Sequence, residues 1–239
     1  DLITRALTLQ PYFSEAHSNL GMALHSLGNL NEAAESYRRA LVTDPKYAEA
    51  HNNLGLTLQA LGKSEDAKDC YYQALSIKPE YAEAHYNLAN TFFALGQHAE
   101  AITNFNEALV LRPEYSEAHF NRGNALRELG EMDKALASYE NALIFKADFA
   151  EAHVNIGIVL QTLGKLGDAE ESFRKALSFN PNCVDAFNSY GTLLVSLNRD
   201  NEALTYFGKS LELMRGENPV TPNDTIFRWI SKAKMRHDI

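Results

Sequence analysis

Residues 48–81 read AEAHNNLGLTLQALGKSEDAKDCYYQALSIKPEY, and the chain repeats this 34-residue pattern without insertion. The opening letters recur as SEAHSNLG, AEAHYNLA, SEAHFNRG, AEAHVNIG and VDAFNSYG. A fixed period of this size is typical of proteins that stack one structural unit many times. We therefore expect six complete repeats within the 239 residues, with the boundaries 14–47, 48–81, 82–115, 116–149, 150–183 and 184–217.

Each repeat predicts two helices, which we call helix A and helix B, when its positions are numbered 1 to 34. Positions 3, 7, 10, 11 and 14 are mostly apolar, and the same spacing returns at positions 20, 21, 24, 27 and 28. This is the 3.6-residue period of one helix face. Position 15, between the two apolar stretches, is Gly in five repeats and Asn198 in the sixth. Gly and Asn most readily adopt the left-handed backbone conformation that commonly ends an α-helix. Position 32 is Pro in four repeats, which ends helix B, but it is Ala147 in repeat four.

Three further positions carry a family resemblance. Position 8 is Gly or Ala, position 20 is always Ala, and position 24 is always Tyr or Phe. This combination resembles the tetratricopeptide repeat (TPR) over most of the chain. The resemblance implies an all-α, right-handed TPR solenoid of six helix-turn-helix repeats, and a role in protein recognition.

The two ends of the chain differ from the repeats. Residues 1–13 match the last positions of a preceding, truncated repeat, so we expect the chain to be part of a longer protein. Residues 218–239 read as a loop followed by a helix over 225–236, which we interpret as a C-terminal capping helix. The alternative is a docking helix for another domain or for a second copy, which would make the protein a homo-oligomer.

Composition excludes several classes of protein. The net charge of −9 argues against a nucleic-acid binder and is compatible with basic peptide partners. No apolar run approaches the length of a membrane span, so we expect no membrane association. Cys70 and Cys183 lie three repeats apart, too far for a disulfide, which fits an intracellular, cytoplasmic protein.

Histidine at position 4 is the only recurrent residue that suggests chemistry: His17, His51, His85, His119 and His153. A spacing of 34 residues does not gather metal ligands as an i, i+3 or i+4 spacing does. We interpret these histidines as packing residues. No catalytic motif is present, so we predict no enzyme activity, no cofactor and no metal.

Asparagine at position 6 is the strongest functional signal: Asn19, Asn53, Asn87, Asn121 and Asn155. This stripe of helix A is turned away from the apolar face, so we expect the side chains to be exposed. An Asn in a helix interior is less favourable than Ala by up to roughly 0.7 kcal/mol, which suggests that these residues have a function that offsets this loss of stability. A carboxamide donates and accepts, so a row of them can hold an extended peptide backbone. The alternative is that each Asn bonds a neighbouring repeat and holds the stack together.

Residues beside this Asn row predict which peptide segments the chain would prefer. Tyr86 and Phe120 at position 5, with Phe93 at position 12, suggest an apolar binding surface, unless they pack between adjacent A helices. Position 2 is always acidic and includes Glu83 and Glu117, which would favour basic or hydroxyl-bearing segments. The alternative for the acids is that they complement the helix dipole.

An Asn row with acids at position 2 is similar to the superhelical arm of O-GlcNAc transferases, where such a ladder holds substrate peptides. The resemblance implies a substrate-recognition arm of a protein glycosyltransferase as one alternative function. A self-associating structural scaffold is another. A TPR clamp for chaperone tails needs Lys or Arg at positions 2, 5 and 6, which this chain lacks. We therefore predict a non-catalytic scaffold that binds an extended peptide segment through its Asn ladder.

Overall fold

A computed structural model describes residues 13–217, with side chains as far as Met214. The chain divides into two compact units, residues 1–125 and 126–239, and we describe each by itself. The expected end of a preceding repeat, residues 1–12, and the expected loop and capping helix, residues 218–239, lie outside the described residues.

All regular structure within residues 13–217 is α-helical, in twelve helices. The A helices are α2 (Ser14–Ser26), α4 (Ala48–Ala60), α6 (Ala82–Ala94), α8 (Ser116–Glu128), α10 (Ala150–Thr162) and α12 (Val184–Ser196). The B helices are α3 (Leu30–Thr43), α5 (Ser64–Ile77), α7 (His98–Leu111), α9 (Met132–Phe145), α11 (Leu166–Phe179) and α13 (Asp200–Glu217). Every A helix begins at position 1 of its repeat. The all-α repeat fold predicted from the sequence is confirmed.

The turn between helix A and helix B has one geometry in every repeat. In the first repeat Gly28 has φ +78°, and its N–H bonds the carbonyl of His25 at 2.9 Å. The following N–H, from Asn29, bonds the carbonyl of Leu24 at 2.9 Å. This pair of bonds is the Schellman motif, which satisfies the last carbonyls of a helix. Asn198 supplies the left-handed residue in the sixth repeat with φ 57°, so the sequence prediction for position 15 is confirmed there too.

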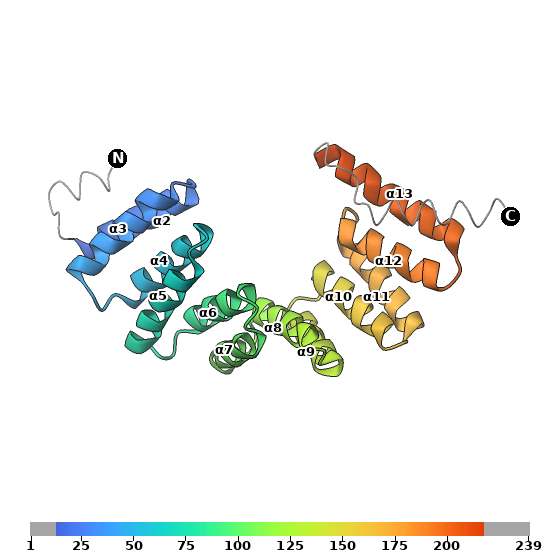
Figure 1. The fold of residues 1–239 in the computed structure, drawn as a ribbon, viewed down its shortest axis with the longest axis horizontal. Helices are drawn as coiled ribbons and strands as arrows, with labels where there is room; N and C mark the ends of the chain where they lie inside the picture. Colours follow the sequence, from blue (N-terminus) through green and yellow to red (C-terminus); the bar gives the residue numbers. More distant parts are fainter. Residues whose placement is uncertain (1–12, 218–239) are drawn as a thin grey trace. The chain divides into compact units, whose positions relative to one another are not determined.

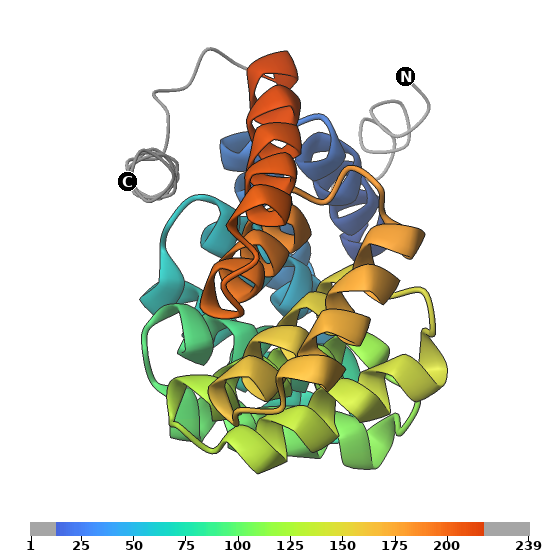
Figure 2. The ribbon, with the colours of Figure 1, turned by 90° about the vertical axis from the view of Figure 1, so that its right-hand side faces the viewer.

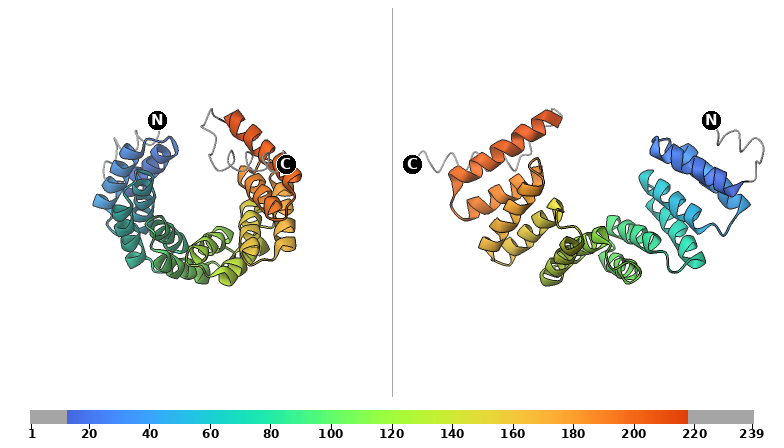
Figure 3. Two further views of the ribbon diagram at one scale, coloured as in Figure 1. Left: turned by 45° about the vertical axis from the view of Figure 1, so that its right-hand side comes forward. Right: turned by 180° about the vertical axis from the view of Figure 1, so that it is seen from behind.

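The core of each repeat forms where an aromatic ring of helix B meets the Gly or Ala of helix A. Tyr37, Tyr71, Phe105, Phe173 and Phe207 are between 0 and 3% exposed. The two helices of a repeat lie side by side, as α2 with α3 and α12 with α13 show (Figure 1, Figure 3). Figure 2 shows α13, drawn in red, from its outer side. In the first unit the aromatic rings join with Leu54 and Leu88 into one continuous core.

Helix B ends at the same place in repeat four although that repeat lacks the proline. Helix α9 ends at Phe145 and α7 ends at Leu111, which are equivalent positions. The residue that follows α9 is Lys146, with φ −141° and ψ 83°. The residue that follows α7 is Arg112, which precedes Pro113 and has nearly the same angles, φ −139° and ψ 87°. The backbone at Lys146 therefore already has the extended shape that a following proline imposes.

Replacing Ala147 with Pro is accordingly expected to raise the free energy of unfolding by about 0.4–1 kcal/mol, because proline restricts the unfolded chain. Urea denaturation followed by circular dichroism measures this change. A lower midpoint for the Ala147→Pro variant would show that this turn differs from those of the other repeats.

Candidate functional site

The Asn row on the A helices is less exposed than the sequence pattern suggested. Asn19 is exposed, whereas Asn53, Asn121 and Asn155 are half-buried. Asn87 is buried, with 9% of its surface exposed. The Asn side chains are less exposed than expected because consecutive A helices pack against each other, so part of this stripe faces the preceding repeat.

Asparagine side chains join repeats two and three. The amide nitrogen Nδ2 of Asn87 donates to Oδ1 of Asn52 at 2.9 Å. Asn52 in turn donates from its Nδ2 to Oδ1 of Asn53 at 3.3 Å. Asn52 is buried, at 4% exposure, and lies at position 5, which sequence reasoning did not single out in this repeat. These bonds link α4 to α6 through side chains alone.

A second group of side-chain bonds joins repeats three and four within the first unit. The amide nitrogen of Asn121 donates to the hydroxyl of Tyr86 at 3.0 Å and to Oδ1 of Asn90 at 2.9 Å. An amide nitrogen carries two hydrogens, so both donors of Asn121 are used inside the chain. For Asn87 and Asn121 the geometry therefore supports the inter-repeat role. In the second unit, Asn155 accepts from Arg127 at 3.4 Å.

Of the aromatic residues named from the sequence, Tyr86 contacts one of these amides, Asn121, in the first unit. The ring of Tyr86 packs on Tyr115, with ring centroids 4.7 Å apart, and burial raises the pKa of its hydroxyl. Phe93 packs against His98 at 5.2 Å, and Phe120 is half-buried. These three rings are thus partly packed and partly accessible.

The acids at position 2 are paired in the middle repeats. Lys78 lies 3.1 Å from Glu49, and Arg112 makes an ion pair with Glu83. Partial burial acts to raise the pKa of Glu83, but the hydrogen bonds from Arg112 and the backbone, together with the charges of Arg112 and Lys78, outweigh it and hold that pKa below its usual range. Glu117 is exposed and accepts from the hydroxyl of Ser116 at 2.9 Å. The acidic row is therefore partly neutralised by the chain itself.

The position-4 histidines bond the end of the preceding helix B. Nε2 of His51 and of His85 lies 3.0 Å from the carbonyl oxygens of Pro45 and Pro79. The same bond measures 2.9 Å for His119 and 3.2 Å for His153. A carbonyl only accepts, so Nε2 carries the hydrogen. Each bond fixes one repeat to the next, as the packing interpretation expected. Among residues 13–217 no group of three metal-ligating side chains comes together.

Acid is expected to destabilise the protein through two of these rings. Burial is the main cause that lowers the pKa of His119 and His153. In the unfolded chain each His takes up a proton below its usual pKa of about 6.5. The pKa of each His is lower in the folded protein than in the unfolded chain. The free energy of unfolding therefore keeps its full value above that pH and decreases as the pH falls below it.

The check is urea denaturation at two pH values on either side of this pKa, with the double variant His119→Phe/His153→Phe as comparison. Phe187 occupies the same position in repeat six and is buried, so the ring is tolerated there. The variant should lose less stability on acidification than the parent chain. Equal losses in the two proteins would contradict the role of these histidines.

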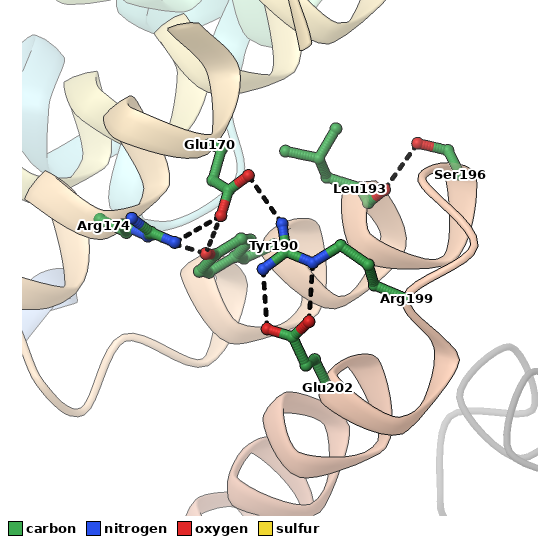
Figure 4. A network of polar contacts seen from close by, with 7 residues as sticks. All are labelled: Glu170, Arg174, Tyr190, Leu193, Ser196, Arg199 and Glu202. Atoms are coloured by element: carbon green, nitrogen blue, oxygen red, sulfur yellow. Dashed lines mark hydrogen bonds and ion pairs between the residues drawn. The ribbon is translucent and has the colours of Figure 1, made fainter. Parts of the chain in front are cut away.

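A polar network in the second unit joins α11, α12 and α13 (Figure 4). Tyr190 donates its hydroxyl to Glu170 at 2.8 Å and accepts from Nε of Arg174 at 2.9 Å. Arg199 bonds Glu170 at 2.9 Å and Glu202 at 2.7 Å. Because these charges satisfy one another, the network joins repeats five and six.

Comparison with known proteins identifies the repeat. Models described as TPR repeat and tetratricopeptide repeat match residues 21–62, 47–114, 87–151 and 150–183, which together run from 21 to 183. The chain belongs to the tetratricopeptide repeat family. Comparison with curated proteins gave no match. None of the described TPR helices has an apolar stretch long enough to cross a bilayer.

Three solved structures show what this TPR chain is similar to. MamA is 28% identical with a TM-score of 0.64, over 67% of this chain and 94% of MamA. YrrB, described as a TPR protein with an unusual peptide-binding site, is 25% identical with a TM-score of 0.65, over 78% and 96%. PilW, described as a type IV pilus biogenesis factor, is 26% identical with a TM-score of 0.75, over 82% and 91%.

Proposed function

We propose that this TPR chain is a non-catalytic scaffold that binds an extended protein segment along its A helices. The observation that carries the proposal is the surface where accessible carboxamides, Asn19 and Asn53, share the A helices of the first unit with half-buried rings. The similarity to YrrB, which is described as having a peptide-binding site, supports it.

The residues of this surface divide into two groups. Asn19 and Asn53 would hold the peptide backbone, with Asn155 doing so in the second unit, while Tyr86, Phe93 and Phe120 set the side-chain preference. Asn87 and Asn121 would act by keeping adjacent A helices at the right separation, since their amide nitrogens donate to the preceding repeat. Glu83 and Glu117 would lie at the edge of the bound segment.

The test compares two double variants in a lysate pull-down read by mass spectrometry. Asn19→Ala/Asn53→Ala removes accessible carboxamides, and Asn87→Ala/Asn121→Ala removes inter-repeat bonds. We expect the first variant to lose the captured proteins with a smaller fall in its thermal midpoint than the second, because it removes the Asn52–Asn53 bond within α4 whereas the second removes the bonds between repeats. If the first variant captures the same proteins as the parent chain, the Asn row is not the binding surface.

The same surface serves the alternative function, substrate recognition for a protein glycosyltransferase. The Asn row and the acids at position 2 favour it, whereas the pairing of Glu49 and Glu83 with cations of the chain reduces the charge available to a substrate. A captured set made up of substrates of one glycosyltransferase would select this alternative. Self-association is a separate alternative, and sedimentation velocity at several concentrations tests it.

A further inference from the structure

Repeats two and three each contain a built-in site for a positive charge. In repeat two, Nζ of Lys78 lies 4.7 Å from the ring centroid of Tyr81 and 3.1 Å from a carboxylate oxygen of Glu49. In repeat three, the guanidinium of Arg112 lies 4.8 Å from the ring centroid of Tyr115 and makes an ion pair with Glu83. The site consists of an acid at position 2 and a ring at position 34, and its occupant comes from position 31.

The site accepts both kinds of cationic side chain. An ammonium fills it in repeat two and a guanidinium fills it in repeat three, and Lys146 lies 4.3 Å over the ring of Phe149 in repeat four. A cation is attracted to the negative face of an aromatic ring, and the carboxylate adds a second attraction. The specificity of the site is thus for positive charge on a long side chain.

Repeat one keeps the acid and the ring but lacks the cation. Glu15 stands at position 2 and Tyr47 at position 34, while position 31 is Asp44. Within residues 13–217 no Lys or Arg lies over the ring of Tyr47, and none pairs with Glu15. Asp44 is too short to reach the place that Nζ of Lys78 takes, and its sign is opposite.

The backbone just before Tyr47 has the same shape as in repeat two, although Tyr47 itself has φ −80° where Tyr81 has φ −107°. Asp44 has φ −131° and ψ 91°, and Lys78 has φ −132° and ψ 85°. The turn is held by the same histidine bond, since His51 and His85 lie at equal distances from the carbonyls of Pro45 and Pro79. The alignment of the repeats thus assigns to Glu15 and Tyr47 the places that Glu49 and Tyr81 take in repeat two. Tyr47 is only half-buried and Glu15 is exposed, so a side chain from outside can enter.

We infer that Glu15, Asp44 and Tyr47 form a site for a lysine or arginine side chain of a bound protein. The incoming cation takes the place that Lys78 and Arg112 take in their own repeats, and Asp44, whose Oδ1 accepts from the backbone N–H of Lys46 at 3.0 Å, adds negative charge at position 31. Arginine fits better than lysine, because its planar guanidinium stacks on a ring while donating to a carboxylate. That the cation arrives on a protein segment rests on the proposed function, whereas the site itself rests on the comparison of repeats.

The test uses the peptide acetyl-Gly-Gly-Arg-Gly-Gly-amide and its citrulline counterpart, which has the same shape without the charge. Binding is followed by NMR through the ring signals of Tyr47, with Tyr81 and Tyr115 as internal controls whose faces are already covered. We expect the arginine peptide to shift the Tyr47 signals and the citrulline peptide to bind about tenfold more weakly. The Tyr81 and Tyr115 signals should stay in place.

Two variants close and open the site, and Asp44→Lys also removes the bond from the backbone N–H of Lys46 to Asp44, which Lys78 cannot make in repeat two. Asp44→Lys supplies the missing cation within the chain and should abolish the shift at Tyr47. Lys78→Asp reproduces repeat one in repeat two and should create a new shift at Tyr81. Both substitutions are at exposed positions, so circular dichroism should show unchanged helix content. The inference is overturned if the arginine peptide does not shift Tyr47, or if Asp44→Lys leaves the shift intact.

These outcomes are separable from those of the lysate pull-down. A positive peptide titration with no captured protein would keep the cation site and reject the peptide-binding scaffold. Captured proteins that depend on Asn53, together with a negative titration, would keep the scaffold and reject the cation site.

Discussion

Replacing Phe173 with Ala is expected to lower the free energy of unfolding by about 3–5 kcal/mol. The ring is 0% exposed and packs against Gly157 of the facing helix. It also stacks on Tyr190 of the next repeat, with ring centroids 6.0 Å apart. Truncation therefore removes buried contacts within repeat five and between repeats five and six, and leaves a cavity that the helices fill only in part.

Phe179→Ala is the matched control for this variant. Phe179 lies on the same helix, α11, but is 48% exposed. Phe179→Ala should lower the free energy of unfolding by well under half as much as Phe173→Ala, because much of the Phe179 ring is already in contact with water. Urea denaturation of the two variants gives both values. Equal losses would show that the aromatic at position 24 is not the centre of the repeat.

Three glycines of repeat five should respond differently to the same substitution, Gly→Ala. At Gly157 a Cβ would lie 2.6 Å from Cε1 of Phe173, and we expect a loss of about 1–3 kcal/mol from overpacking. At Gly164 nothing lies within 4 Å, but φ is +76°, so the expected loss of about 1–2 kcal/mol comes from backbone strain. Gly167 is helical and open, so Ala should stabilise by about 0.5–1 kcal/mol.

The order of the three free energies distinguishes the causes. A second substitution, Phe173→Leu, should relieve part of the loss at Gly157 and none of the loss at Gly164, since only the first loss arises from contact with the ring. Thermal and urea denaturation of the single and double variants measure this coupling. If Phe173→Leu rescues both glycine variants equally, the assignment of causes is wrong.

The helices and turns could be predicted because local residues determine them. The apolar spacing sets both helices of a repeat, and Gly or Asn at position 15 sets the turn, as Asn198 shows. The end of helix B depends less on proline than expected, because Lys146 has the same backbone shape before Ala147 as Arg112 has before Pro113.

The candidate surface could be predicted only in part. The helical register told which face Asn87 occupies, but not that Asn52 of the preceding repeat lies 2.9 Å away. Whether a side chain on that face meets solvent or the next helix depends on how repeats pack, which a periodicity does not encode. The ion pair between Lys78 and Glu49, which are 29 residues apart, was not predicted from the sequence. Opposite charges at positions 2 and 31 of the same repeat were the available signal.

The uniform turn at position 15 has a consequence for how such a chain changes over generations. Each 34-residue period contains this turn once and at the same position, so a duplication or deletion of one period, cut at position 15, would join two equivalent turns. Gain or loss of any of the first four repeats would also bring or remove one acid at position 2 together with one ring at position 34, whereas repeat five has Cys183 at position 34 and carries no such ring. Copy number and the number of these acid-and-ring pairs therefore change together within the first four repeats.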